Sequence, residues 1–366
     1  MQPVAVRILH PTPASTAGPL QRALTAARDT NADRLVALFR SAGATDVERV
    51  SGPPDGRPFG ARLGGLVAGL AAGSGLVVLG SGAIPLAMRA DAVALLDVAG
   101  SGVRRAVANN TYSADVVAIG AAANLASVPD LPSDNALPRW LREHAGYEVT
   151  DLPRPRLQLD LDSPLDVLLA DAVQPGAAAA LSGVDTSFVR ARTDGLRAMA
   201  RDPRRQLVVT GRLSSATIRW LEGGTASRTR ALIEERGLRA SGLVSDQAPP
   251  RSVLGMLLDD RGPDALGTIL AELGDAAVVD SRVLLAHRLG ADESAWPAPE
   301  DRFASDLLLP DRIGDPWLRA VTESARDASI SVLLGGHTLV GPGLRLAIGG
   351  RSRSTSGDRR AGEGRR

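Results

Sequence analysis

The sequence predicts an α/β protein with two domains. The first is a three-layer α/β/α, doubly wound and mainly parallel sheet, and the second is helix-rich. In the first half, short apolar runs alternate with amphipathic segments, which is typical of a sheet covered by helices. The run GLVVLG (75–80) is apolar throughout, as expected for a strand buried on both faces. A chain of 366 residues with 44% hydrophobic content is long enough to build two cores.

The elements of the first half follow in a regular order. The first predicted helix stops at Gly43, a residue that commonly ends helices. The predicted strands are 4–9, 45–50, 75–80 and 103–109, and the predicted helices are 20–41, 59–73, 87–98 and 135–145.

Beyond residue 170 most segments have helical patterns. The clearest strand candidates are 206–211 and 329–336. Arg and Glu residues at helical spacing in 227–237 predict an exposed, salt-bridged helix. We therefore expect a first domain at 1–180 and a helix-rich domain of unknown role at 181–349, followed by a disordered Arg-rich tail at 350–366.

Composition excludes several classes of chemistry. The chain has no cysteine, which rules out disulfides, zinc fingers, iron–sulfur ligation and thiol nucleophiles. It also has no lysine, so a Schiff-base enzyme and a P-loop lysine are excluded, and any anion must be held by arginine, backbone N–H groups or a metal ion. Neither a secretory signal nor an 18-residue apolar run is present, so we expect a cytoplasmic protein without a membrane partner. Six arginines against two acids in 351–366 make the chain slightly basic, and the folded body shows no nucleic-acid footprint.

Two loops after predicted strands carry groups that could bind a ligand. Ligands of parallel α/β sheets sit beyond the carboxyl ends of the strands. In GSGAIP (80–85) the glycines allow backbone N–H groups to approach an anion, although a plain turn explains them equally well. The loop ANNTYSAD (108–115) is rich in groups that could recognise a base or a sugar. The candidate binding residues are Gly80, Ser81, Gly82, Asn109, Asn110, Thr111, Tyr112 and Asp115.

The stretch LQLDLDSP (157–164) holds two carboxylates at the predicted end of a strand. Period-two alternation places Asp160 and Asp162 on the same face. Two carboxylates so close repel each other unless one is protonated or a cation such as Mg²⁺ lies beside them. Ser163, Pro164 and Asp166 fit the N-cap, first and third positions of a helix, so capping alone explains Asp166.

The stretch RLQLDLDSPLDVLLA (156–170) resembles the late-strand signature of GT-A-like nucleotidyltransferases. These include the molybdenum-cofactor guanylyl- and cytidylyltransferases and 2-phospholactate guanylyltransferase. The element order of the first 175 residues is similar to that fold. The resemblance covers the N-terminal half only. It implies transfer of a nucleotidyl group from a nucleoside triphosphate to a small phosphorylated acceptor, with Mg²⁺ held by Asp160 and Asp162.

The third strand departs from this pattern because it ends in Ser81 and Gly82, where the family carries a metal-binding aspartate. Either Asp115 or Asp134 substitutes, or the site binds a nucleotide without metal-assisted transfer. The alternatives are therefore a catalytically inactive nucleotide- or metabolite-binding protein and a sugar-nucleotide-dependent glycosyltransferase on the same fold.

The second half offers one further candidate site. Between a predicted strand and a predicted helix lie four residues that could bind a phosphate group, although a simple N-cap also explains the serines. They are Gly211, Arg212, Ser214 and Ser215. His10 and His337 are the best candidates for proton transfer among four histidines.

Overall fold

A six-stranded mixed sheet organises the first half of the chain in the computed structural model, which describes residues 2–53, 55–125, 127–238 and 248–349. The strand order is β2-β1-β3-β5-β4-β6, and only β5 runs antiparallel to its neighbours. The strands are β1 (Val4–Pro11), β2 (Asp46–Gly52), β3 (Gly75–Gly80), β4 (Arg105–Ala108), β5 (Val116–Ile119) and β6 (Glu148–Asp151).

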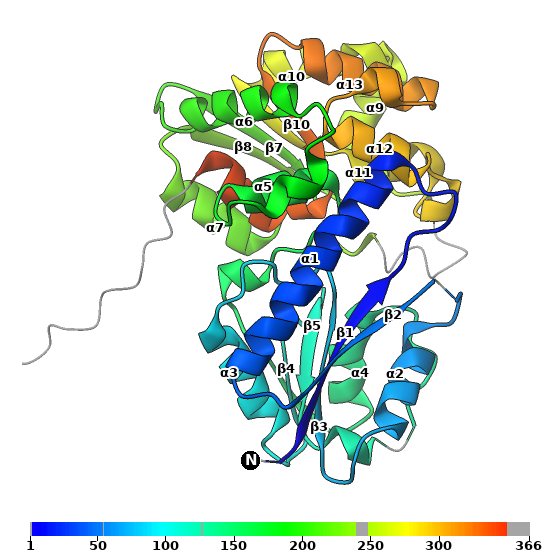
Figure 1. Cartoon of the computed structure of the whole chain (residues 1–366). Coiled ribbons are helices and arrows are strands. Elements are labelled where there is room, and N and C mark those ends of the chain that lie inside the picture. Colours follow the sequence, from blue (N-terminus) through cyan, green and yellow to red (C-terminus); the bar gives the residue numbers. More distant parts are fainter. Residues whose placement is uncertain (1, 54, 126, 239–247, 350–366) are drawn as a thin grey trace, which may run out of the picture.

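Helices cover both faces of this sheet (Figure 1). Val77 and Leu79 of β3 face one core and Leu76 and Val78 face the other, as alternation along a strand requires. One core contains residues of α1 (Pro19–Ser41) and α3 (Arg89–Ala99), and the other contains residues of α2 (Phe59–Ala68) and α4 (Leu137–Glu143).

The second half contains its own sheet, which is wholly parallel and has the order β10-β9-β7-β8. Its strands are β7 (Gln206–Gly211), β8 (Arg228–Ile233), β9 (Ala276–Asp280) and β10 (Ser331–Gly335). The α-helices in the described part of this half are α6 (Ser187–Met199), α7 (Ser215–Gly224), α9 (Val253–Arg261), α10 (Leu266–Leu273), α11 (Ser281–Leu289), α12 (Pro299–Asp306), α13 (Pro316–Asp327) and α14 (Leu344–Ile348), and α5 (Pro164–Asp171) ends the first half. The description of this half as helix-rich therefore overlooked half of its sheet, because β8 and β9 were not predicted.

The prediction of a helix over 227–237 was wrong. Residues 228–233 form β8, which pairs with β7 at the edge of the second sheet. An edge strand has a solvated face, so its charged side chains can mimic the spacing of an exposed helix, while pairing with β7 satisfies its backbone.

The predicted strand at 157–162 is also absent. Only one residue pair, Ala83 with Asp160, forms an isolated antiparallel bridge. The predicted alternation of side chains nevertheless holds, since Leu157, Leu159 and Leu161 are buried. The prediction of a disordered tail at 350–366 concerns residues outside the described ranges.

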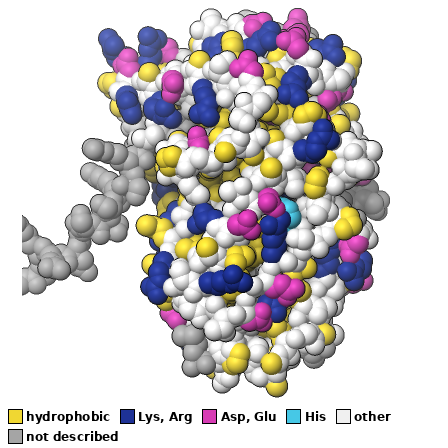
Figure 2. Space-filling model, viewed as in Figure 1, with side chains coloured by type: hydrophobic (Ala, Val, Ile, Leu, Met, Phe, Trp, Pro, Cys, Tyr) yellow, Lys and Arg dark blue, Asp and Glu magenta, His cyan; other side chains and the backbone are white. Residues whose placement is uncertain are grey.

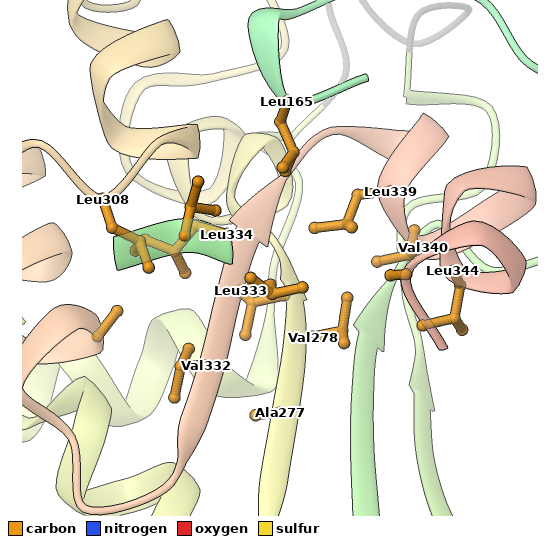
Figure 3. Close-up of a cluster of buried hydrophobic side chains, with 14 of the residues drawn as sticks. Leu165, Ala277, Val278, Leu308, Val332, Leu333, Leu334, Leu339, Val340 and Leu344 are labelled. Atoms are coloured by element: carbon orange, nitrogen blue, oxygen red, sulfur yellow. The ribbon is translucent and has the colours of Figure 1, made fainter. Parts of the chain in front are cut away.

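Two segments of the first half belong to the core of the second sheet. Leu20, Leu24 and Ala27 of α1 pack in the same apolar cluster as the second sheet. Figure 3 shows Leu165 of α5 directed towards Leu334 of β10 and Leu339, and a Cβ added to Gly335 would lie 3.3 Å from Leu165. Helix α1 thus extends from the six-stranded sheet to α12 (Figure 1).

Glu300 of α12 caps the N-terminus of α1 across this junction. Its carboxylate accepts hydrogen bonds from the backbone N–H of Leu20 (3.0 Å) and of Gln21 (3.2 Å). A Cβ on Gly18 would lie 2.2 Å from Glu300 Oε2, so a glycine is needed for this approach. The first N–H groups of a helix have no partner within the helix and in other folds can bind a phosphate. In α1 the Glu300 side chain accepts their hydrogen bonds instead.

We expect Glu300→Ala to lower the free energy of unfolding by about 1–2 kcal/mol, because two helix N–H groups lose their acceptor and the helix dipole loses its counter-charge. Urea unfolding measures this loss. Glu222→Ala, at an exposed position of α7, is the matched control and should change stability little.

The same contact predicts coupling between Gly18 and Glu300. Gly18→Ala should destabilise the native protein but cost less in the Glu300→Ala background, where no carboxylate meets the new methyl group. Additive losses in the double variant would contradict the proposed cap.

Candidate functional site

A cavity of about 190 Å³ lies at the carboxyl ends of β1 and β3. Ligands of parallel α/β sheets usually bind at this edge of the sheet. Several of the expected binding residues line it together, and they come from segments far apart in the sequence. The polar and glycine residues of its wall are Arg28, Gly80, Ser81, Gly82, Asp115, Asp134 and Asp160.

Helix α1 holds the GSGAIP loop in place. The Asn31 amide donates hydrogen bonds to the carbonyls of Ser81 (2.8 Å) and Ala83 (3.0 Å), and Asn31 is buried. One turn further on, Arg34 donates to the carbonyl of Ile84 (3.0 Å). Ile84 has a φ of 42°, a conformation that a β-branched residue adopts only when surrounding contacts enforce it. Hydrogen bonds from α1 therefore fix the backbone of the loop that forms this part of the cavity wall.

An isolated β-bridge between Ala83 and Asp160 places Asp160 in the cavity wall. The backbone N–H of Leu161 donates to the carbonyl of Gly82 (3.1 Å), which brings the two segments together. A Cβ on Gly82 would lie 2.7 Å from Asp160 Oδ1. The glycine of the loop and the carboxylate were predicted as separate features, and the structure shows that the first makes room for the second.

Asp115 and Asp160 line the cavity, whereas Asp162, two residues from Asp160, is not among its wall residues. Burial raises the pKa of Asp160 well above its ordinary value, and the Asp162 and Asp115 carboxylates raise it further. Arg28 opposes this shift and has its Nη2 3.6 Å from Asp162 Oδ1. The repulsion among these carboxylates is the condition that a bound cation relieves.

The residues of the 109–115 loop divide between structural contacts and the cavity. Asn109 donates to Asp115 Oδ2 (2.7 Å) and to the Leu157 carbonyl (2.9 Å), so it ties the loop to the 157–162 segment. Thr111 donates to Asp151, and Asn110 accepts the N–H of Tyr112, whose side chain is 81% exposed. Of the predicted residues in this loop, the cavity wall includes Asp115.

The four candidate phosphate ligands of the second half are not among the wall residues of this cavity. Arg212 forms a two-point ion pair with buried Asp280 (2.6 and 3.0 Å), and Gly211 has a φ of 123° beside the same carboxylate. Ser214 caps α7 by accepting the N–H of Thr217, and Ser215 is the first residue of that helix. In this conformation the Arg212 guanidinium is engaged by Asp280.

Sequence reasoning missed Arg28 and Asn31. A signal for Asn31 was present, because it occupies a core position in the apolar stripe of α1 that runs through Leu24, Ala27 and Leu35. A polar residue at such a position needs a buried partner, which here is the backbone of the GSGAIP loop.

The predicted helix start after Asp162 is confirmed. Ser163 is the N-cap of α5, Pro164 opens the helix, and the Asp166 carboxylate accepts the Ser163 N–H (2.8 Å). Asp166 is buried, and burial together with the Asp162 carboxylate raises its pKa to about 8.

Comparison with known proteins gives no assignment. The chain matches no family model and no curated protein. In the described ranges, no helix is both long and apolar enough to cross a bilayer.

Asp166 makes stability depend on pH. Its pKa is raised in the folded state, so between about pH 4 and 8 the native protein keeps a proton that the unfolded chain releases, and stability falls as pH rises. Asp166→Asn keeps an acceptor oxygen and removes this titration. We expect its free energy of unfolding to fall less steeply between pH 5.5 and 7.5, by up to about 1.4 kcal/mol per pH unit.

Urea unfolding at four pH values in that range measures the slope. Asp194→Asn is the control, because that side chain is 73% exposed and should leave the slope unchanged. Equal slopes for Asp166→Asn and the native protein would contradict a protonated Asp166.

Proposed function

We propose that the cavity binds a nucleoside triphosphate with Mg²⁺ and that the protein transfers a nucleotidyl group to a small phosphorylated acceptor. The observation that carries this proposal is the group of Asp115, Asp160 and Asp162, close enough to raise the pKa of Asp160, beside a glycine-flanked loop at the carboxyl edge of the sheet. A divalent cation bound between the two would neutralise the negative charge of the carboxylates and that of a polyphosphate ligand.

The donor set fits a magnesium ion that shares its ligands with the substrate. Among the described residues, no group of three or more His, Asp or Glu side chains is arranged to hold a metal ion alone. Mg²⁺ in such enzymes takes one or two carboxylates and completes its shell with phosphate oxygens and water. Asp160 and Asp162 would hold the ion, which supplies charge neutralisation at the phosphates. Asp115 or Asp134, which line the same cavity, would take the place of the aspartate missing at Ser81.

The chain's own groups have distinct tasks under this proposal. Arg28 supplies a positive charge in the cavity wall and donates through Nε to the Leu161 carbonyl (2.7 Å), which orients the segment bearing Asp160. The Ser81 and Gly82 backbone approaches a ligand without a bulky side chain in the way. Five strands of the first sheet share one direction, and β5 runs opposite to them. This arrangement supports the GT-A-like fold that the sequence resemblance implies.

One observation favours a second candidate, a nucleotide-binding protein that has lost transfer activity. Ser81 directly follows the third strand, and its hydroxyl is no substitute for a metal-binding carboxylate. Binding without Mg²⁺ would then depend on Arg28 and the loop backbone alone.

Thermal unfolding with each of the four nucleoside triphosphates, with and without Mg²⁺, tests the proposal. We expect one nucleotide to raise the melting temperature by several degrees in the presence of Mg²⁺, since a ligand at 100 times its Kd adds about 2.7 kcal/mol. Asp160→Asn should abolish the Mg²⁺-dependent part of this rise.

Asp97→Asn, at an exposed position of α3, is the control and should leave the rise intact. Stabilisation that does not depend on Mg²⁺ would support the binding protein instead of the transferase. The absence of any response to all four nucleotides would reject both.

A further inference from the structure

A buried serine and histidine meet at the wall of the cavity. Ser81 Oγ lies 3.0 Å from His10 Nδ1. Ser81 directly follows β3, and His10 belongs to the adjacent strand β1. The nucleotidyl transfer proposed above uses neither side chain. Their spacing is that of a hydroxyl nucleophile and the base that activates it.

The backbone of Ser81 is held on both sides. Its N–H donates to the carbonyl of Leu9 (2.8 Å), and its carbonyl accepts from Asn31 (2.8 Å). Glycines at 80 and 82 flank it in the cavity wall, so neither neighbouring residue has a side chain that blocks a ligand from Ser81. A nucleophile needs this rigidity, because attack requires a fixed distance and direction.

Asp29 sets the state of the imidazole. Its Oδ1 lies 3.6 Å from His10 Nε2, beyond hydrogen-bonding distance but near enough to favour the tautomer that carries its proton on Nε2. In that tautomer Nδ1 has a free electron pair facing the Ser81 hydroxyl. Asp29 itself is paired with Arg49 of β2.

The charges around His10 keep it neutral. Burial is the largest cause that lowers its pKa below the ordinary 6.5, followed by Arg49, while Asp29 opposes the shift. Arg28 lowers the pKa further, and Asp33 raises it. At neutral pH the imidazole is therefore available as a base.

We propose that Ser81 is a nucleophile towards phosphorus, activated by His10, and that it forms a covalent adduct with a phosphate ester or anhydride bound in the cavity. The bond from Ser81 Oγ to phosphorus forms as the bond from phosphorus to the leaving oxygen breaks. The Ser81 proton passes to His10 Nδ1 and then to the leaving oxygen. Water or an acceptor oxygen reverses the sequence and releases Ser81. The inference uses the cavity of the proposed function but requires neither a nucleotide nor a metal ion.

Diisopropyl fluorophosphate tests the inference, because it presents an electrophilic phosphorus with fluoride as the leaving group. Mass spectrometry of the full chain should show a single adduct, and peptide mapping should place it on Ser81. Ser81→Ala should abolish the adduct, whereas Ser74→Ala, a buried serine at the opposite end of β3, should leave it unchanged. A folded native protein without an adduct on Ser81 would overturn the inference.

The role of His10 has its own readout. His10→Gln should slow labelling at least about 100-fold, while His144→Gln at an exposed position should not change it. In the native protein the labelling rate should rise with pH through a single ionisation below 6.5. A flat profile between pH 4.5 and 7 would overturn the assignment of His10 as the base, even if the His10 variant failed to fold.

Asp29 acts as a positioning residue in this scheme. Asp29→Asn should slow labelling and move the ionisation to lower pH, because the carboxylate that raises the pKa of His10 is lost. If the pH dependence of labelling is the same in Asp29→Asn and the native protein, Asp29 does not position His10. Labelling of Ser81 without any nucleotide-dependent thermal shift would retain this inference and reject the proposed nucleotide, so the two tests fail independently.

Discussion

The burial of helix α1 in two separate cores is the constraint on which the rest of the structure depends. Its first turns place Leu20 and Leu24 in the core of the second sheet, and its later turns place Leu35 and Phe39 against the first. A single helix cannot rotate to improve one contact without losing the other, since the same stripe serves both. The relation between the two halves of the chain is thereby held by apolar packing and by the Glu300 cap.

The same helix also determines the shape of the cavity. Arg28 and Asn31 interrupt the apolar stripe where α1 crosses from one core to the other. Asn31 holds the Ser81 carbonyl of the cavity wall, and Arg28 holds the Leu161 carbonyl next to Asp160. Buried polar groups of this kind specify one arrangement because any displacement leaves them without partners. The positive φ of Ile84 and the close approach of Asp160 to Gly82 are maintained by these contacts. The residues that hold the loop therefore also hold the backbone next to the Ser81 and Asp160 side chains. On the face seen in Figure 2, charges of both signs are interspersed instead of gathering in one patch.

The elements with strong local signals could be predicted from the sequence. The buried strand at 75–80 and the helix start at Ser163 and Pro164 were recognisable because a continuous apolar run and an N-cap act over a few residues. The short strands β5, β6 and β9 were missed, and β8 was taken for a helix, because their identity depends on neighbours that pair with them. The 157–162 segment shows the distinction most clearly: its side-chain alternation was predicted correctly, but a bridge to Ala83 holds it instead of a strand.

By itself, the sequence determined the α/β class, the local turns and caps, and the presence of Asp160 and Asp162 at a helix start, since these follow from patterns within a few residues. Only the tertiary structure decided that Ser81, Asp115, Asp134 and Asp160 share one cavity and that His10 lies against Ser81. It also decided that the Arg212 guanidinium is engaged by Asp280. Contacts between residues so distant in the sequence depend on how whole helices and strands pack. Local sequence patterns do not determine which strand ends come together.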